Sequence, residues 1–296
     1  QLLWEQFMLP WQKHKSAPLW SPTNTGPAFA SNHVVTLHDI GVFPHPEWFA
    51  PNYVRWKRLL IPKMARHARG ILTVSEFSRQ IICTHLDITP AKVTVVYNGI
   101  DHQRFVPAAK ESMQQVAQKY AIKQPYLLTL GSLDPRKNFA GLLEAWNRCI
   151  HQEKLTDYQL VIAGGSQASL GKVDTQASAK KVQFLGYVDD EDLAPLYSGA
   201  TAFLFPSLFE GFGLPVVEAM ACGTPVLTSN TTALDEIAGE AALKVNPADT
   251  AAIKNGIMEL VESKGLQTSL VEKGFERITQ FDWNQSAQAI YKYLVP

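Results

Sequence analysis

The stretch that most constrains the fold of this chain runs from Thr201 to Asn230 and reads TAFLFPSLFEGFGLPVVEAMACGTPVLTSN. Its apolar start at 201–205 is rich in β-forming residues and predicts a buried strand, which is followed by a glycine-containing loop. Pro215 has the fixed φ angle of a first helical turn, so we expect a helix over 216–221 and then a strand over 224–228. A strand, a glycine loop, a helix and a second strand form the crossover of a parallel sheet.

The loop before that helix predicts a site for a negatively charged ligand, because the helix dipole favours an anion there and glycine lets a ligand approach closely. Its backbone N–H groups belong to Gly211, Phe212, Gly213 and Leu214. Glu210 in the loop and Glu218 on the first helical turn would repel a phosphate but suit hydroxyl groups beside it. A ligand with phosphates and hydroxyls is a nucleotide sugar. The alternative is a buried glycine turn in which Glu218 complements the helix dipole.

The sequence around these two glutamates resembles a known signature. Glu210 and Glu218 are separated by seven residues, with GFGLP after the first and AMACGTPV after the second. This spacing is similar to that of retaining glycosyltransferases of family 4, and the resemblance recurs along almost the whole chain. It implies the α/β GT-B fold, in which two Rossmann-like domains face each other across a cleft. It also implies that Glu210 contacts the transferred sugar and that Glu218 binds the ribose hydroxyls.

Composition is consistent with two α/β domains, since 46% of the 296 residues are hydrophobic. The three cysteines are far apart in the sequence and have no metal-ligand spacing, which predicts reduced core thiols in a cytoplasmic protein. No apolar run is as long as a membrane span. Residues 1–100 hold ten basic and five acidic residues, a net charge of +5 in a chain that is neutral overall.

The N-terminal half is predicted to carry a strand over 34–37 that ends at His38 and Asp39, where ligands bind in open α/β sheets. The segment TLHDIGVFPHP resembles the same strand end in family 4, whose histidine approaches the donor sugar. That resemblance implies a catalytic position for His38. Asp39 is expected either to orient the histidine or to cap the loop. We also expect an amphipathic helix over 2–15, and a helix over 76–85 with Ser75 as its N-cap.

A helix predicted over 52–69 mixes basic and aromatic residues. Its basic residues are Arg55, Lys57, Arg58, Lys63, Arg66 and Arg69, and its apolar ones are Tyr53, Trp56, Leu59, Leu60 and Met64. One interpretation is contact with a membrane surface or a lipid-linked substrate. The other is a surface helix whose apolar side packs on the sheet. Nucleic acid is not expected as a partner, because no recognised binding module accompanies these charges.

The second domain is predicted to open with a strand over 126–130, followed by GSLDPRKNFAGLLEAW. Arg136 and Lys137 precede a helix that begins near Asn138, and two cations at such a junction suit a diphosphate leaving group. As an isolated feature, such a pair is more often part of a solvated turn. Family 4 binds the diphosphate with a basic pair at this place, which implies a catalytic role for both residues. Ser132 stands where the family often has an arginine.

Two further segments bear on the donor. A strand over 160–163 ends at Gly164 and Gly165, which predicts a close-approach turn near the nucleotide. A strand over 182–185 precedes Tyr187 and Val188, which in the family lie near the nucleotide base. The acidic run at 189–192 stands at a helix start, where acids cap N–H groups and complement the dipole, so we do not expect a metal site. The family likewise needs no metal or other cofactor. After the central motif, residues 232–239 resemble a turn of the family.

We therefore predict a partial N-terminal domain over 1–106, a nucleotide-sugar-binding domain over 107–278, and a segment over 279–296 whose helix, predicted over 283–294, crosses back to the first. The predicted activity is retaining glycosyl transfer to a glycan or lipid-linked acceptor, at the inner face of the membrane if the basic helix binds lipid. The segment PRKN resembles the mannosyltransferase branch, which favours GDP-mannose over a UDP-sugar. The alternatives are an inert nucleotide-sugar-binding scaffold and an NAD-dependent oxidoreductase, which the absence of a GxGxxG motif disfavours.

The sizes of the two predicted domains differ by about 66 residues, whereas the two halves of a GT-B enzyme are normally similar in size. The glycine-rich loop expected after the first strand is also missing. We therefore expect the chain to be a fragment with an incomplete N-terminal sheet and an unpaired apolar strand edge. Such a fragment is expected to bind nucleotide and to transfer sugar weakly or not at all.

Overall fold

The computed structural model describes residues 4–9, 17–30, 32–152, 155–164 and 181–295. The chain forms two compact units. Unit 1 contains residues 1–99, 210–212 and 283–296, and unit 2 contains residues 100–209 and 213–282. The division at Gly99 and Ile100 lies a few residues before the boundary that we predicted at 106. Each unit is described by itself below.

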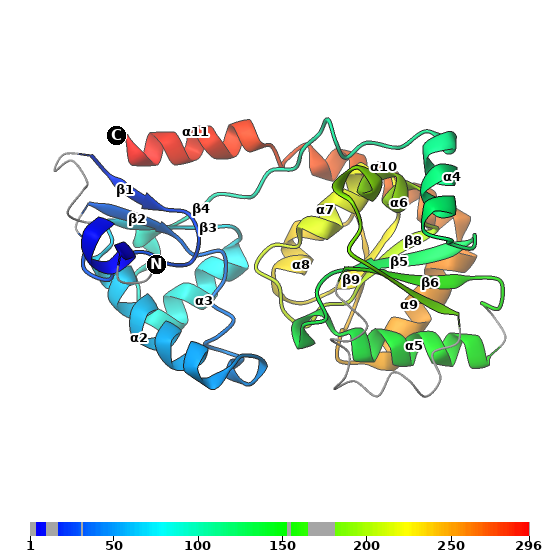
Figure 1. Cartoon of the computed structure of the whole chain (residues 1–296), viewed down its shortest axis with the longest axis horizontal. Helices are drawn as coiled ribbons and strands as arrows, with labels where there is room; N and C mark the ends of the chain where they lie inside the picture. The colour runs from blue at the N-terminus through cyan, green and yellow to red at the C-terminus, as the bar shows by residue number, and fades with distance from the viewer. Residues whose placement is uncertain (1–3, 10–16, 31, 153–154, 165–180, 296) are drawn as a thin grey trace. The chain divides into compact units, whose positions relative to one another are not determined.

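Unit 1 is built on a parallel sheet of four strands in the order β1-β2-β3-β4. The strands are β1 (Leu19–Ser21), β2 (His33–Thr36), β3 (Gly70–Thr73) and β4 (Val93–Val95). Helices α2 (Pro51–His67) and α3 (Glu76–Leu86) lie on one face of the sheet, and α11 (Trp283–Leu294) lies on the other (Figure 1). Within the described residues, β1 and β4 are the edge strands. The strand predicted over 34–37 is β2, which is paired on both sides.

The core of unit 1 lies between the sheet and its two helices. Val35 and Ile71 from the strands pack with Ile61 and Met64 of α2 and with Ile82 of α3. Short 3-10 helices, η2 (Pro46–Trp48) and η3 (Pro90–Lys92), precede α2 and β4. Of the helix predicted over 2–15, the structure describes a π-helical turn, η1 (Trp4–Met8). The rest of that prediction falls mainly outside the described residues.

Unit 2 is built on a parallel sheet of six strands in the order β10-β9-β8-β5-β6-β7. Its strands are β5 (Tyr126–Leu130), β6 (Gln159–Ala163), β7 (Val182–Gly186), β8 (Ala202–Phe205), β9 (Val226–Ser229) and β10 (Leu243–Val245). Its helices are α4 (Lys110–Lys119), α5 (Phe139–His151), α6 (Leu193–Ser198), α7 (Leu214–Ala221), α8 (Thr232–Ala238), α9 (Thr250–Glu262) and α10 (Lys264–Ile278), with 3-10 turns η4 (Pro135–Lys137) and η6 (Asp190–Asp192). The crossover predicted from the central motif is β8-α7-β9, and β8 and β9 pair in parallel.

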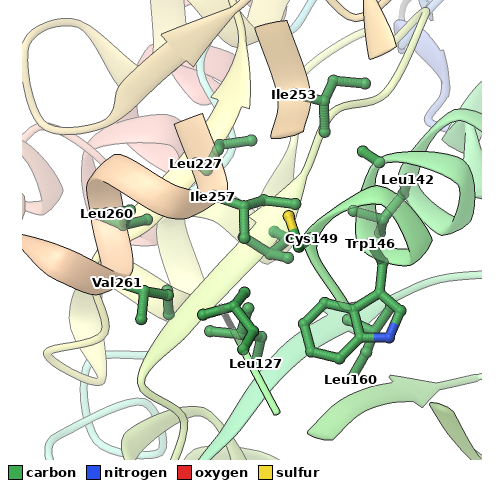
Figure 2. Close-up of a cluster of buried hydrophobic side chains, with 14 of the residues drawn as sticks. Leu127, Leu142, Trp146, Cys149, Leu160, Leu227, Ile253, Ile257, Leu260 and Val261 are labelled. Atoms are coloured by element: carbon green, nitrogen blue, oxygen red, sulfur yellow. The ribbon is translucent and has the colours of Figure 1, made fainter. Parts of the chain in front are cut away.

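Helices α5 and α9 pack against each other and against the sheet (Figure 1). Between them lies the main core of unit 2, in which Trp146 and Cys149 of α5 lie near Ile253 and Ile257 of α9 (Figure 2). All four side chains are fully buried. Cys149 and Cys222 are buried free thiols and Cys83 is partly exposed, so the prediction of free cysteines is confirmed.

Two predictions about unit 2 were wrong in detail. The segment after β9, expected to be a turn, forms the short helix α8, which begins at Thr232 with a φ of 62°. Glu218, expected on the first turn of its helix, lies one turn further along because α7 already begins at Leu214. Its position therefore does not support the alternative in which Glu218 complements the helix dipole from the first turn.

Candidate functional site

The sheet of unit 2 brings together the loops that follow β5 and β8, since these two strands are neighbours. The backbone N–H of Leu208 donates to the carbonyl of Arg136 at 2.7 Å. Asn138 joins the same loops, because its side-chain nitrogen donates to the carbonyl oxygens of Pro206 at 3.1 Å and Pro247 at 2.7 Å. Asn138 is also the N-cap residue of α5, which begins near it as predicted, and has a φ of 56°. These hydrogen bonds fix the loop that carries Arg136 and Lys137 at the C-terminal ends of β5 and β8.

Arg136 is held in place by Asp134. The guanidinium nitrogens Nε and Nη2 each lie 3.1 Å from a carboxylate oxygen of Asp134, and Asp134 Oδ1 also accepts from the backbone N–H of Arg136. Burial raises the pKa of Asp134, but these hydrogen bonds and the charge of Arg136 outweigh it and leave that pKa below its ordinary value. Our sequence analysis did not identify Asp134, although its position two residues before Arg136 is typical of a side chain that caps a turn.

Lys137 lies over the strand ends. Its ammonium nitrogen is 4.8 Å from the centroid of the Phe205 ring at the end of β8. A Cβ at Gly131, directly after β5, would lie 3.4 Å from Lys137 Cε, so the lysine stem runs along this glycine. Lys137 therefore presents a cation at the C-terminal edge of the sheet, where open α/β folds bind their ligands.

Three glycines at the ends of neighbouring strands have left-handed φ angles, namely Gly131, Gly164 and Gly186. A Cβ at Gly164 would lie 2.8 Å from the carbonyl oxygen of Gly131, and its own N–H donates to the carbonyl of Gly186. Gly164 therefore lies close to the backbone that follows the neighbouring strand β5, and its predicted proximity to a nucleotide stays a prediction. Gly165, predicted with it, lies outside the described residues.

Gly213 precedes α7 with a φ of 106°, and a Cβ there would lie 2.5 Å from Leu234. A side chain other than glycine would therefore be strained and would clash. Leu214 is the first residue of α7, and its N-cap residue Gly213 has no side chain that could accept from the first N–H groups of the helix. Such N–H groups are suited to an anionic ligand in place of a capping side chain.

Glu218 lies one turn further along α7 and is half-buried. Its Oε2 accepts a hydrogen bond from the hydroxyl of Tyr197 at 2.9 Å. Burial raises the pKa of Glu218 above its ordinary value, and the hydrogen bond from Tyr197 and the charge of Arg104 offset this rise only in part. Neither Tyr197 nor Arg104 was singled out from the sequence.

Tyr187 and Val188 follow β7, and they differ in exposure. The Tyr187 side chain is 78% exposed, whereas Val188 is buried. We had expected the acidic run that follows to cap the helix start, but the N-cap residues Asp189 and Asp192 make no such side-chain hydrogen bond. Asp189 and Asp192 instead accept hydrogen bonds from Lys119 at 2.8 and 2.6 Å. Among the described residues, no group of three or more His, Cys, Asp or Glu side chains is arranged to hold a metal ion.

Residues 210–212, which include Glu210, belong to unit 1. Within that unit, the carbonyl oxygen of Gly211 accepts hydrogen bonds from Ser75 Oγ at 2.7 Å and from Ser78 Oγ at 3.2 Å. A Cβ at Gly211 would lie 2.5 Å from the carbonyl oxygen of His38, so a larger residue would not fit. Phe212 is buried, with its ring centroid 6.2 Å from that of Tyr97.

His38 lies beyond the end of β2, and its Nε2 is 2.8 Å from the carbonyl oxygen of Pro22, to which it donates. Asp39 accepts from the backbone N–H of Gly41, so it caps the loop, one of its two expected roles. The histidine borders a small cavity of about 180 Å³ within unit 1, which Trp20, Tyr97 and Trp283 also line. The cavity lies between the strand ends and α11.

Comparison with known proteins identifies the family. The sequence profile described as "Glycosyl transferases group 1" matches residues 112–277, and that described as "Glycosyltransferase Family 4" matches residues 14–104. The chain belongs to glycosyltransferase family 4. The family resemblance predicted from Glu210 and Glu218 is thereby confirmed.

Curated relatives of this family 4 chain include bacterial mannosyltransferases. The chain is 35% identical over 279 residues to the O-antigen chain mannosyltransferase B of Escherichia coli, a match that covers 90% of the chain and 73% of that protein. It is 31% identical over 232 residues to the O-antigen chain mannosyltransferase RfbU of Salmonella typhimurium, covering 76% of the chain and 60% of that protein. A match to the serotype-specific mannosyltransferase WbdA of Escherichia coli covers 32% of that protein.

Solved structures confirm the fold. HepE from Anabaena in complex with UDP and glucose superposes with a TM-score of 0.75 at 20% identity, over 88% of this chain and 71% of that one. The lipopolysaccharide glycosyltransferase WaaG superposes with a TM-score of 0.73 at 15% identity, over 95% of this chain and 79% of that one. The two parallel-sheet α/β units are therefore those of a GT-B protein.

Proposed function

We propose that this family 4 chain transfers mannose from GDP-mannose to a glycan or lipid-linked acceptor, with retention of configuration and without a metal ion. The named activities of the relatives support mannose as the sugar, since the O-antigen chain mannosyltransferases of Escherichia coli and Salmonella typhimurium match over most of this chain. A UDP-sugar is the competing donor, as the complex of HepE with UDP and glucose illustrates.

The observation that carries the proposal is the placement of charge in unit 2. Lys137 lies over the C-terminal strand ends, at the junction that also carries Arg136. Glu218 offers a carboxylate on α7, the helix of the neighbouring crossover. Cations suit a diphosphate, and a carboxylate suits the hydroxyls of a ribose. In the proposed reaction, a hydroxyl oxygen of the acceptor bonds to the anomeric carbon of the sugar as the bond between the sugar and the diphosphate breaks, and the leaving phosphate oxygen takes the proton of that hydroxyl. Lys137, Arg136 and the N-terminus of α7 then stabilise the negative charge of the leaving group.

Contact with an anionic membrane at the cytoplasmic face is part of this proposal, because α2 carries basic and aromatic side chains on its outer surface. Among the described residues, no helix combines the length and the apolar character that a membrane crossing requires. The proposed contact is therefore with the membrane surface, through α2.

A thermal-shift screen with GDP, UDP and NAD tests the proposal, because a ligand that binds the folded state raises the melting temperature. We expect GDP to stabilise the protein most, UDP less, and NAD not at all. Incubation with GDP-mannose and an oligomannose acceptor then tests transfer. Stabilisation by GDP without any transfer would favour the inert binding protein, and stabilisation by NAD alone would refute the proposed donor.

A further inference from the structure

Tyr197, on α6, is fully buried, yet its polar end meets a residue of the proposed donor site. Its hydroxyl oxygen lies 2.9 Å from Oε2 of Glu218 on α7, and the helices α6 and α7 are in contact. An ionised carboxylate has no proton to give, so the phenol is the donor in this bond. Burial and the nearby charge of Glu218 raise the pKa of Tyr197 well above its ordinary value, which keeps the hydroxyl protonated.

The tyrosine is fixed from several sides. Its carbonyl oxygen accepts from Thr224 Oγ1 at 2.7 Å. Its ring packs edge-on against Phe105 and Phe203, with centroid separations of 6.3 and 5.2 Å. A donor held this rigidly fixes the orientation of the carboxylate that accepts from it. Oε2 is engaged by the phenol, which leaves Oε1 to accept from a ligand.

The charges that face Glu218 come from several elements. The Arg104 guanidinium lowers the pKa of Glu218, and Asp190 of η6 raises it. Arg104 is itself held by Asp190, whose carbonyl oxygen lies 2.6 Å and whose carboxylate lies 3.2 Å from Nη2. Cys222, one turn further along the chain, is a buried thiol whose pKa is raised to about 12, so it is neutral. The hydrogen bond from the tyrosine also lowers the pKa of Glu218, so loss of the tyrosine hydroxyl would raise this pKa and favour the protonated carboxyl group.

We propose that Tyr197 is a positioning residue, which orients and polarises Glu218 so that its carboxylate recognises the ribose diol of the donor nucleotide. This inference rests on the proposed role of Glu218. It adds a specific consequence, namely that the preference for a ribose diol over a sugar without it depends on a hydroxyl that never touches the ligand.

The test compares binding of GDP and of 2′,3′-dideoxy-GDP by calorimetry, for the unmodified chain and for Tyr197→Phe. We expect Tyr197→Phe to weaken GDP binding about tenfold, the scale of one hydrogen bond to a charged group, and to leave the dideoxy nucleotide nearly unchanged. The ratio of the two affinities should therefore fall. As the solution is acidified, Tyr197→Phe should lose GDP affinity at a higher pH than the unmodified chain does, because the pKa of Glu218 rises without the phenol.

Tyr126→Phe is the matched control. Tyr126 is also a buried tyrosine of unit 2, but its hydroxyl donates to the carbonyl oxygen of Leu196 at 2.7 Å. We expect this control to keep both the affinity ratio and the pH profile, whatever its effect on the melting temperature. An unchanged ratio and pH profile in Tyr197→Phe would overturn the inference.

Two further variants separate the inference from the proposed function. Glu218→Gln should lose the preference for GDP, and if it does not, the ribose role of Glu218 fails and the inference fails with it. Glu218→Asp keeps a carboxylate but withdraws it from the phenol, so it should also lose the preference. If Glu218→Asp retained full discrimination, the contact with Tyr197 would not be needed, and the inference would be refuted independently of how Tyr197→Phe folds.

Discussion

The Lys137 ammonium lies 4.8 Å from the centroid of the Phe205 ring, so the end of β8 holds this lysine over the end of β5. Its neighbour Arg136 is engaged differently, by two hydrogen bonds to the Asp134 carboxylate. The two members of the basic pair are therefore positioned by different side chains, the guanidinium by a carboxylate and the ammonium by an aromatic ring.

Lys137→Ala and Arg136→Ala should each weaken the binding of a nucleoside diphosphate, and neither should much affect the nucleoside. The expected loss for Lys137→Ala is about 1.5–3 kcal/mol, the contribution of a hydrogen bond to a charged group. Calorimetric titration with GDP and with guanosine measures both effects. Lys273→Ala, at an exposed position on α10, is the control and should bind like the unmodified chain. Equal losses of affinity for the nucleoside and for the diphosphate would show that Lys137 does not contact the phosphates.

The two glutamates of the central motif should separate binding from turnover. Glu218→Gln should weaken GDP binding, because a ribose is present in the product as well as in the donor. Glu210→Gln should leave GDP affinity nearly intact and instead reduce turnover or the affinity for the sugar part of the donor. Titrations with GDP and with GDP-mannose, together with donor-hydrolysis rates, measure these effects, and Glu259→Gln on the exposed side of α9 is the control. The same profile for both variants would show that this division of roles is wrong.

How much of the fold could be predicted from the sequence depended on the strength of local signals. The bounds of β5 and of α11 match the prediction, because an apolar run and an amphipathic period mark them clearly. The helix α8 was missed, since its seven residues begin at Thr232 in a backbone conformation that threonine rarely adopts. The three-residue strand β10 is too short to give a pattern.

The candidate site shows the same limit. Glu218 stood out because it lies in a recognisable motif, but its partner Tyr197 is twenty-one positions away and was visible only as an apolar residue before a strand. Asp134 is close to Arg136 in the sequence and was a possible partner for its side chain. However, no local sequence pattern distinguishes a carboxylate that forms an ion pair with a neighbouring residue from one that is solvated. Contacts between residues distant in the sequence arise from the packing of whole elements, which local patterns do not describe.

Ser75 combines a predicted role with one that the sequence did not reveal. Its Oγ accepts from the backbone N–H of Ser78 at 3.0 Å, which confirms the predicted N-cap of α3, and it also donates to the carbonyl of Gly211. Ser75→Ala would remove the cap and leave a buried carbonyl with one donor fewer. We expect the free energy of unfolding of unit 1 to fall by about 2 kcal/mol.

Ser263→Ala is the matched control for that cap. Ser263 caps α10 through Leu266 at 3.2 Å and is only partly buried, so its loss should cost about 1 kcal/mol or less in unit 2. Urea unfolding of both variants, followed by circular dichroism, compares the two. Equal losses would indicate that the bond to the Gly211 carbonyl contributes nothing measurable.

The outer surface of α2 leads to the last prediction. Tyr53, Trp56 and Leu59 are exposed at 45%, 38% and 62%, and the helix has no acidic residue. The exposed basic residues of this helix are Arg55, Arg58, Lys63 and Arg66. Lys57, which we had grouped with them, is buried, and its Nζ donates to the carbonyl of Asn24 at 3.2 Å. A helix surface with exposed aromatic rings among cations is suited to the interface of an anionic bilayer.

The protein should therefore bind vesicles that contain phosphatidylserine, and salt should weaken this binding because exposed charges are screened. Reversing Arg55, Lys63 and Arg66 to Glu together should abolish the binding measured by vesicle co-sedimentation, since each basic residue near such a surface contributes about 1 kcal/mol. The control reverses Lys110, Lys123 and Lys273, three exposed lysines of unit 2, and makes the same change in net charge. If both triple variants lose binding equally, attraction depends on net charge alone, and if the α2 variant still binds, this helix does not contact the membrane.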